Sequence, residues 1–174
     1  MEEKQVRELK IGDKVELSGI IFTARDKAHL YLLESRFQKL ENGIIYHCGP
    51  IVKDNKVVSA GPTTSERLSL YAPDIIKKYR IKAIIGKGGM DNNTLKAMKE
   101  HGCVYLAAIG GAGALIASKI KSIKNIYKKE FGMPEAIYEL EVENMPAIVA
   151  MDSKRNSIYE KILKHSGKKL SVKQ

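Results

Sequence analysis

Cysteine is scarce in this sequence. Cys48 and Cys103 are the only two among 174 residues, and they lie far apart in the chain. They form no CxxC pair and no Cys/His spacing typical of a zinc site. In a reducing compartment such cysteines are expected to be free thiols. A [4Fe–4S] cluster is normally held by several cysteine thiolates, so the chain lacks a full ligand set and we expect no metal ligands in it.

Long apolar runs are absent as well. The sequence has no stretch of about 18 apolar residues, which excludes a transmembrane helix. Its first residues, M-E-E-K-Q, lack the apolar segment of a secretory signal, so we expect a cytoplasmic location without membrane association. Internal repeats and low-complexity linkers are also missing. We therefore predict one domain over residues 1–174, with a core at about 9–159 and a basic C-terminal tail at 160–174.

The charge is strongly unbalanced, since 30 Lys and Arg residues oppose 20 Asp and Glu residues and give a net charge of +10. Such a balance is typical of proteins that bind nucleic acid, an acidic partner or anionic substrates. Many of the lysines fall in residues 119–129 and 161–173, which we interpret as a solvated helix face and a mobile tail. Few aromatic residues interleave with them, which argues against binding of single-stranded nucleic acid.

Strand and helix patterns alternate through the middle of the chain. Strands are predicted at residues 15–23, 44–47, 57–60, 82–85, 103–107, 137–142 and 147–151. Helices are predicted at residues 26–40, 64–79 with a break near Pro73, 91–101 ending at Gly102, and after the glycine-rich segment 110–114. A turn is expected at residues 152–156. This order indicates an α/β domain with a mixed sheet core.

Residues 61–67, G-P-T-T-S-E-R, follow a predicted strand and open a predicted helix. Thr63 and Glu66 have the spacing of a capping box, which is a purely structural explanation. The free N–H groups and dipole of a helix N-terminus also make an anion site, and Arg67 adds a fork that can grip a carboxylate with two hydrogen bonds. Capping does not explain Arg67, because a cation is unfavourable there unless an anion is bound or paired.

A second glycine-rich turn, G-K-G-G-M at residues 86–90, also connects a strand to a helix. Glycines let the backbone form an anion-binding nest, and Lys87 supplies a point charge. The spacing fits neither a Walker A loop nor a dinucleotide fingerprint, and a plain flexible turn is the structural alternative. Gly110, Gly111 and Gly113 fail the same fingerprint, and we interpret that segment as close packing between elements.

Arg25 ends a predicted strand, and Asp26 opens the next helix, where a negative charge suits the helix dipole. His29 is more typical of a structural than of a catalytic histidine, and His47 and Cys48 are neighbours on a strand, so their side chains should point to opposite faces. Ligands of open α/β folds bind at strand ends. A small dianion such as a dicarboxylate suits the cations and hydroxyl expected there, which are Arg25, Thr63, Arg67 and Lys87.

Six motifs occur in a particular order along the chain. They are T-A-R-D-K-A-H at 23–29, G-P-T-T-S-E-R at 61–67, G-K-G-G-M at 86–90, F-G-M-P-E-A at 131–136, E-V-E-N-M-P-A at 141–147 and D-S-K at 152–154. The ordered set resembles the C-terminal domain, or separate beta subunit, of class I fumarases and L(+)-tartrate dehydratases. The resemblance covers about residues 9–159 and leaves Cys48 and the basic tail without an assigned role.

The resemblance implies a fold, a partner and a reaction. The fold would be a single swivelling β/β/α domain, and the [4Fe–4S] cluster would be held by a partner alpha subunit in an α2β2 assembly. The active site would lie between the subunits and hydrate fumarate reversibly to L-malate. Thr63 would handle the proton, and Arg25, Arg67 and Lys87 would bind the dicarboxylate. Dehydration of L(+)-tartrate is the first alternative, and a stand-alone basic module that binds nucleic acid or another anion is the second.

Overall fold

A computed structural model describes residues 2–108 and 111–169. Its α-helices are α1 (Glu3–Glu8), α2 (Asp26–Glu34), α3 (Ala72–Tyr79), α4 (Asn92–His101), α5 (Gly113–Ala117) and α6 (Ile158–Lys169). Its strands are β1 (Lys14–Thr23), β2 (Ile44–Tyr46), β3 (Ile51–Lys53), β4 (Lys56–Ser59), β5 (Ala83–Gly86), β6 (Val104–Ala107), β7 (Ile120–Tyr127) and β8 (Ile137–Met151). Three 3-10 helices complete the order, η1 (Gln38–Leu40), η2 (Glu66–Leu70) and η3 (Lys129–Phe131).

The main sheet has the order β1-β2-β5-β6-β8-β7, and β1 also pairs with β8. This additional pairing closes β1, β2, β5, β6 and β8 into a barrel-like ring. Neighbours among β1, β2, β5 and β6 run parallel, whereas β8 is antiparallel to β6, β1 and β7. A separate hairpin joins β3 and β4. The prediction of an α/β fold with a mixed sheet core is therefore confirmed.

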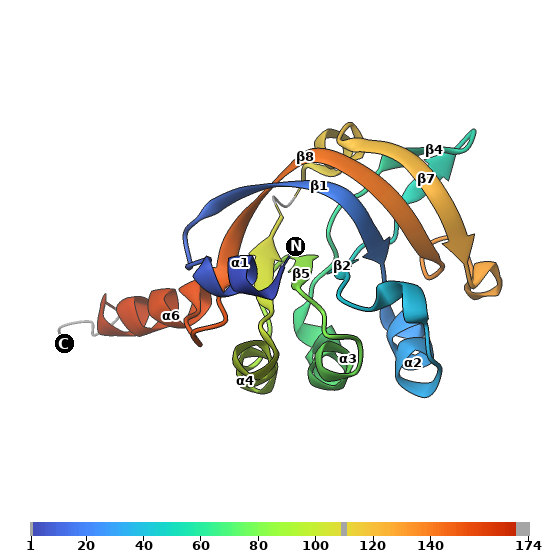
Figure 1. Cartoon of the computed structure of the whole chain (residues 1–174). Helices are drawn as coiled ribbons and strands as arrows, with labels where there is room; N and C mark the ends of the chain where they lie inside the picture. The colour runs from blue at the N-terminus through green and yellow to red at the C-terminus, as the bar shows by residue number, and fades with distance from the viewer. Residues whose placement is uncertain (1, 109–110, 170–174) are drawn as a thin grey trace.

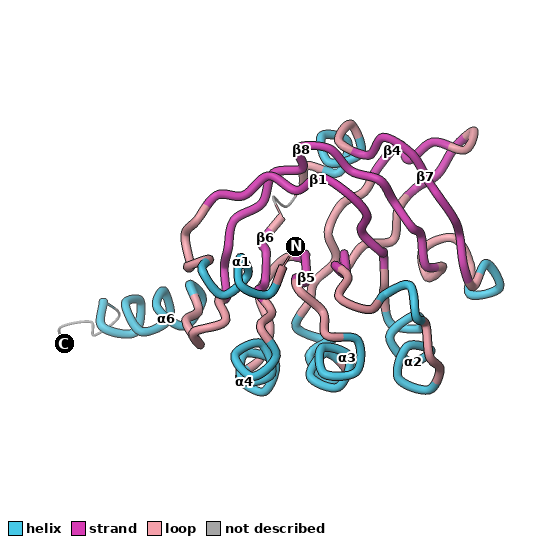
Figure 2. Tube along the Cα trace, viewed as in Figure 1, coloured by secondary structure: helices cyan, strands magenta, loops and turns pink. Residues whose placement is uncertain are grey.

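The ring divides the interior into two hydrophobic cores. Figure 1 shows α2, α3 and α4 side by side at the bottom of the view. The long strands β1, β8 and β7 of the main sheet arch over the top. The tube in Figure 2 shows α6 at the side of the same ring. Ile84 of β5 belongs to the core shared with the helices, whereas its neighbour Ile85 faces the core inside the ring. Alternate residues of a strand point to opposite faces, so one short apolar strand serves both cores.

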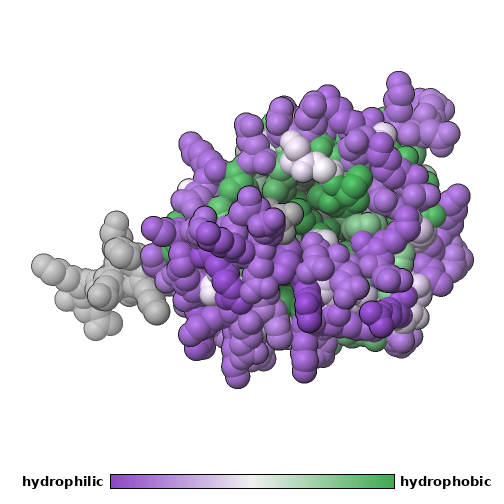
Figure 3. Space-filling model, in the orientation of Figure 1, coloured by the Kyte–Doolittle hydropathy of each residue, from purple (hydrophilic) through white to green (hydrophobic). Residues whose placement is uncertain are grey.

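The surface agrees with this division. On the face drawn in Figure 3, hydrophilic residues predominate, and a hydrophobic area lies between the β1–β8 arch and the helices. Residues that pack against the core inside the ring but are only partly buried include Leu9, Val15 and Ile44. Among the helices in the described part of the chain, none combines the length and apolar character that crossing a membrane requires.

The predicted helix over residues 26–40 is wrong in its second half, since α2 ends at Glu34 and Ser35 has an extended backbone. The side chains that end it come from α3. The Tyr79 hydroxyl donates to the carbonyls of Leu32 at 2.8 Å and Ser35 at 2.7 Å, and Lys78 Nζ donates to the same carbonyls. These tertiary contacts satisfy the carbonyls that a helix end leaves free, so the chain can turn away.

Four further predictions need correction. Residues 64–79 form η2 followed by α3, and Pro73 lies in the first turn of α3 as a proline prefers. Residues 137–151 form one strand rather than two. Among the lysines of residues 119–129, Lys121 and Lys124 lie on strand β7 rather than on a helix face, and residues 166–169, expected to belong to a mobile tail, are part of α6. The elements α1, β3, β7 and α6 were not predicted.

Other local predictions are confirmed. Helix α4 begins after Asp91, whose carboxylate accepts a hydrogen bond from Thr94 N at 2.8 Å, and it ends at Gly102 in a left-handed conformation. Cys48 and Cys103 are free thiols. Close packing of the glycine-rich segment is confirmed at Gly113, where a side chain would approach Ser59 Oγ to 2.6 Å, but not at Gly111, which faces open space; Gly110 lies outside the described residues.

The Tyr79 hydroxyl gives a test of this fold. Tyr79→Phe should lower the free energy of unfolding by about 1–3 kcal/mol, because Phe37 N loses its acceptor and two carbonyls lose a donor. Urea unfolding measures the change. Tyr138→Phe is the control, since no hydrogen bond from that hydroxyl occurs among residues 2–108 and 111–169. Equal stabilities of the two variants would contradict the assigned role.

Candidate functional site

The loop 61–65 lies beside the turn that follows β5. Thr64 and Lys87 form a parallel bridge, Ser65 N donates to Lys87 O at 3.0 Å, and Lys87 N donates to Thr63 O at 3.4 Å. On its other side the loop is tied to the end of β2, because Thr63 N donates to His47 O at 2.7 Å. These backbone bonds act as a short extension of the sheet. They place Thr63 and Lys87 next to one another.

Arg67 joins this loop to the start of α2. Its guanidinium meets the Asp26 carboxylate with two nitrogens, Nε at 3.0 Å from Oδ1 and Nη2 at 3.0 Å from Oδ2. Nη2 also donates to Thr63 Oγ1 at 3.1 Å, and Nη1 donates to Thr64 O at 3.3 Å. A planar fork with four such bonds is held in one orientation. Arg67 therefore fixes the position of the Thr63 hydroxyl.

The pairing with Asp26 answers a question that the sequence left open. A cation at the start of η2 has its counter-charge within the chain, so a bound anion is not required to explain Arg67. The hydrogen bonds from Arg67 hold the pKa of the Asp26 carboxyl below its usual value. The expected capping box is wrong: in the described structure η2 begins after Ser65 without a side-chain cap, and the Thr63 hydroxyl instead accepts from Arg67.

Arg25 lies on the other side of Asp26, at the residue that precedes α2. Its Nε is 3.4 Å from Glu135 Oε1, and Glu135 Oε2 also accepts from Lys27 N at 2.9 Å. The ion pair lacks the alignment of a hydrogen bond, so within the described residues the buried Arg25 Nε has no hydrogen-bond partner. Gly49 makes room for this side chain, because a Cβ there would approach Arg25 Nη1 to 3.0 Å. Arg25 thus retains donors for a ligand.

Lys87 is exposed, and its turn depends on glycine. Gly88 and Gly89 have φ angles of 85° and 82°, in the left-handed region that glycine adopts without strain. A Cβ at Gly89 would also come within 2.5 Å of the Tyr159 ring at the start of α6. Among the described residues no carboxylate lies within salt-bridge distance of Lys87. Its ammonium is therefore available to an anion.

A buried polar layer lies beneath the loop. His47 Nδ1 is 2.8 Å from Ser65 Oγ, and Ser65 Oγ accepts from the Tyr105 hydroxyl at 2.9 Å. The rings of His29 and His47 meet edge to face, with centroids 5.0 Å apart. His29 Nδ1 is 2.7 Å from Arg25 O, so His29 supports α2 as a structural histidine. The sequence predicts that the side chains of His47 and Cys48 point to opposite faces and do not act as a catalytic pair. The hydrogen bond between His47 and Ser65 agrees with this prediction.

The structure brings the four predicted site residues to one region and adds residues that sequence reasoning missed. Thr63, Arg67 and Lys87 are joined directly, and Arg25 adjoins them through Asp26. The missed residues are Asp26, Glu135, His47 and Ser65. Asp26 and Glu135 stand in quoted motifs, which was the available signal. Nothing local in the sequence indicates a hydrogen bond between His47 and Ser65.

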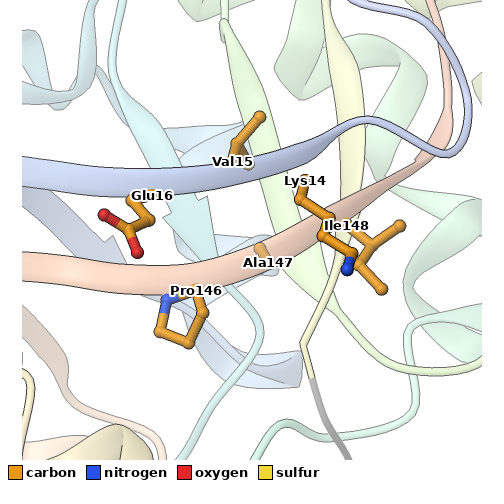
Figure 4. A pocket seen from close by; sticks show the side chains of 6 residues that line it. All are labelled: Lys14, Val15, Glu16, Pro146, Ala147 and Ile148. Carbon is orange, nitrogen blue, oxygen red and sulfur yellow. The ribbon is translucent and has the colours of Figure 1, made fainter.

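A separate cavity, lined by residues of β1 and β8, differs from this site. It has a volume of about 440 Å³ and lies on β1 and β8, where Val15 pairs with Ala147. Figure 4 shows its lining, in which Lys14 and Glu16 are the charged side chains and Val15, Pro146, Ala147 and Ile148 supply apolar surface. One cation balanced by one anion does not suit a dianion. The strand-end cluster is the better candidate.

The chain's own residues do not fit an iron–sulfur cluster. Both cysteines are buried on separate strand ends, and burial raises the pKa of the Cys48 thiol to about 12 and also raises that of Cys103. Cluster and metal ligands are thiolates, which burial disfavours. Among the residues described, no group of three His, Cys, Asp or Glu side chains is arranged to hold a metal ion. The two cysteines of this chain therefore do not provide a ligand set for such a cluster.

Part of the positive charge on the β7–β8 surface is paired. On β7, Lys121 lies 2.5 Å from Glu143 and Lys124 lies 2.7 Å from Glu141 of the neighbouring strand β8. Lys39 similarly lies 3.5 Å from Glu139. A nucleic-acid surface depends on basic side chains that are free to meet phosphates. The observed pairing does not favour that function.

The fold and the site together define an α/β domain with a cationic, hydroxyl-containing site at the carboxyl ends of parallel strands. Comparison with known families identifies the class more closely. The sequence model of the family described as Fumarase C-terminus matches residues 1–162. The chain belongs to this family.

Individual relatives agree. A Geobacillus stearothermophilus protein provisionally named class I fumarate hydratase is 50% identical over 97% of this chain, which spans only 34% of that longer protein. A Methanocaldococcus jannaschii protein provisionally named L(+)-tartrate dehydratase subunit beta is 49% identical, with 97% of this chain and 92% of the relative covered. The L(+)-tartrate dehydratase subunit beta of Escherichia coli K12 is 30% identical, with 89% and 81% covered.

The buried histidines predict a pH dependence of stability. Burial lowers the pKa of His29 from 6.5 to about 4, and that of His47 is also lowered. Between about pH 4 and pH 6.5 the unfolded chain therefore binds more protons than the folded chain. The contribution of the neutral histidine to the free energy of unfolding is complete above pH 6.5 and is lost as the pH falls toward 4. One pKa unit corresponds to about 1.4 kcal/mol, so His29 should account for a loss on the order of 3 kcal/mol.

Urea unfolding at pH 7 and pH 4.5 measures this effect. His29→Gln should flatten the pH dependence, whereas His101→Gln, at a histidine that is not fully buried, should leave it unchanged. The Asp26 carboxyl has a lowered pKa and loses its contribution only at more acidic pH, outside this window. An unchanged slope in His29→Gln would show that this histidine is not the titrating group.

Proposed function

We propose that the chain is the beta subunit of a [4Fe–4S]-dependent hydro-lyase that reversibly adds water to fumarate to give L-malate. The observation that carries the proposal is the bond from Arg67 Nη2 to Thr63 Oγ1, with Lys87 held beside Thr63 by the loop. The arrangement combines one positioned hydroxyl with cations suited to carboxylates. Family membership and the names of the relatives support the same reaction class.

Thr63 is the proposed proton-handling residue. A threonine hydroxyl is a weak base at neutral pH and needs activation. In this site the oxygen already accepts a hydrogen bond from the Arg67 guanidinium, which leaves its own hydrogen free to point toward a ligand. A cation bonded to the oxygen favours the deprotonated form. The deprotonated hydroxyl would take the carbon-bound proton of L-malate, and the hydroxyl would return it during hydration.

Arg25 and Lys87 are the proposed carboxylate-binding residues. Both keep donors that the described residues do not saturate, and they come from different elements, Arg25 from the residue before α2 and Lys87 from the turn after β5. Arg67 is also proposed to contribute, but most of its donors are engaged by Asp26, Thr63 and Thr64. Its first effect is then electrostatic, on the Thr63 oxygen and on charge that develops when the proton leaves.

The cluster is proposed to belong to a partner. The two buried cysteines do not suit one, and relatives of similar length are named as beta subunits, a name that implies an alpha subunit. An alpha subunit that holds the [4Fe–4S] cluster, an α2β2 assembly and a site shared between the subunits are therefore proposals. A swivelling β/β/α type of domain, a single domain over residues 1–174 and a cytoplasmic location stay predictions.

L(+)-tartrate is the alternative substrate, because two of the relatives are named for its dehydration. Fumarate and L(+)-tartrate are both dicarboxylates, and addition of water to the first and removal of water from the second need the same types of residue. An anaerobic assay separates them. Loss of fumarate absorbance would be followed with the chain alone and with a cluster-reconstituted alpha-type chain. Activity with fumarate that requires both chains supports the proposal. Turnover of tartrate but not of fumarate changes the proposed substrate. An intact complex that is inactive with both fumarate and tartrate contradicts the function.

Substitution of Thr63 tests its role. Thr63→Ala should lower kcat by about 10²–10⁴-fold, the usual contribution of a positioned acid or base, whereas Thr63→Ser should retain much more activity because the hydroxyl remains. Lys96→Ala, at an exposed lysine of α4, is the control. If Thr63→Ala loses no more than Lys87→Ala does, the proton-handling role is wrong and Thr63 only binds.

Asp26 tests the positioning of Arg67. Asp26→Ala should lower activity by about 10-fold or more, because the guanidinium loses the partner that orients it toward Thr63. The same change should alter the free energy of unfolding by less than about 1 kcal/mol, since the pair is partly exposed. Glu143→Ala breaks the comparable pair with Lys121 on β7 and β8 and should leave activity unchanged. Full activity of Asp26→Ala would contradict the assigned role.

A further inference from the structure

The hydrogen bonds beneath the candidate site link two strands of the ring, β2 and β6, to the loop that carries Thr63. His47 follows β2, Tyr105 lies on β6, and Ser65 stands between them with its Oγ 2.8 Å from His47 Nδ1 and 2.9 Å from the Tyr105 hydroxyl. His47 and Ser65 are fully buried, with no exposed surface. Neither residue carries a role in the reaction proposed above. The arrangement is a buried strut that ends two residues from Thr63.

The direction of these bonds can be assigned from the donors available. The Tyr105 hydroxyl donates to Ser65 Oγ, so the serine hydrogen is directed to another acceptor. With that direction His47 Nδ1 accepts from the serine, and the ring hydrogen is assigned to Nε2, a buried atom that has no hydrogen-bond partner among the described residues. Burial keeps the pKa of His47 well below its usual value, so the ring is neutral. Nδ1 thus serves as a fixed acceptor for Ser65.

His47 holds the same loop a second time through its backbone. His47 O accepts from Thr63 N at 2.7 Å, while its ring holds Ser65. The residues on both sides of Thr64 are therefore attached to one residue of the sheet. Rotation of the ring away from Ser65 would remove one of the two attachments to His47, while the backbone bonds to Lys87 and the bond from Tyr105 remain.

Gly86 shows how closely Ser65 is packed. A Cβ at Gly86 would lie 1.9 Å from Ser65 Oγ and 2.9 Å from the Tyr105 oxygen. No side chain fits in that space while Ser65 stays in place. The hydrogen bonds of Ser65 therefore require that Gly86, which lies immediately before Lys87, has no side chain.

We propose that His47 is a positioning residue for the reaction, which sets the place of Thr63 by holding Ser65 through its Nδ1 atom. The proposal rests on the proposed function, since the role of Thr63 is part of it. His47 does not touch substrate in this account. Its effect is geometric, and displacement of a reacting group by about 1 Å can lower a rate by about 10²-fold.

Two substitutions at His47 separate position from polarity. In His47→Asn the amide stands where Nδ1 stood and can still accept from Ser65. In His47→Gln the amide lies one bond further out, near the former Nε2, and the bond to Ser65 is lost. Both variants are uncharged, polar and smaller than histidine. A merely structural role would make the longer side chain, which fills more of the space, the less harmful one.

The first measurement is steady-state kinetics of the complete complex with fumarate, after thermal melting has shown that the variants fold. We expect His47→Gln to lower kcat by at least 10-fold with KM changed less than threefold, and His47→Asn to recover most of that loss. Ser65→Ala should resemble His47→Gln and provides a second route if one histidine variant does not fold. Equal activities of the Asn and Gln variants, or a more active Gln variant, would overturn the proposal.

The second measurement needs no activity. Hydrogen exchange of the Thr63 and Ser65 amides in the full chain should be faster in His47→Gln than in His47→Asn. Exchange of the Leu95 amide in α4, which serves as the control, should be equally fast in the two variants. Equal exchange at Thr63 and Ser65 would show that Nδ1 does not hold the loop. If the wild-type complex has no hydro-lyase activity, the proposed function fails, and the exchange result still decides whether His47 positions the loop.

Discussion

The pairing of residues 63–65 with Lys87 is the contact on which the site depends. Two of the sequence motifs, at residues 61–67 and 86–90, meet there because the loop continues the sheet beyond the ends of β2 and β5, with Thr63 N bonded to His47 O and Ser65 N bonded to Lys87 O. Backbone hydrogen bonds at such an edge are more rigid than contacts between exposed side chains. The ring of strands below supplies the rigidity, since β1 and β8 close it and leave β5 buried throughout.

Charge compensation within the site follows from that geometry. Asp26 neutralises Arg67 and orients it, whereas Lys87 and part of Arg25 stay available. A site built only of free cations would repel itself and would bind anions of many shapes. One internally paired arginine beside a hydroxyl, with two further cations at its flanks, is instead directional. The proposed dianion site thus differs from the β7–β8 surface, where Lys121 and Lys124 are paired with glutamates.

The sequence was informative wherever the relevant signal is local. Parallel strand ends followed by helix starts predicted the edge at which Arg25, Thr63, Arg67 and Lys87 gather, and Asp91 and Gly102 marked the ends of α4. Strand β7 was missed for a physical reason. Ile120, Ile123 and Ile126 are spaced three apart, as on a helix, and register shifts after Ile120 and Ile123 turn that spacing into a strand with one face on the core. The Arg67–Asp26 pair and the His47–Ser65 bond join distant segments, and no local pattern encodes them.

The central claim is that this chain supplies the dicarboxylate-binding and proton-handling half of a site completed by a cluster-bearing partner. The most direct test is a crystal structure of the two chains together with a bound dicarboxylate. The account predicts carboxylate oxygens within hydrogen-bonding distance of Arg25 and Lys87, and the Thr63 hydroxyl directed at the carbon that gains or loses the proton. A dicarboxylate bound in the complex without contact to Thr63, Arg25 or Lys87 would contradict it.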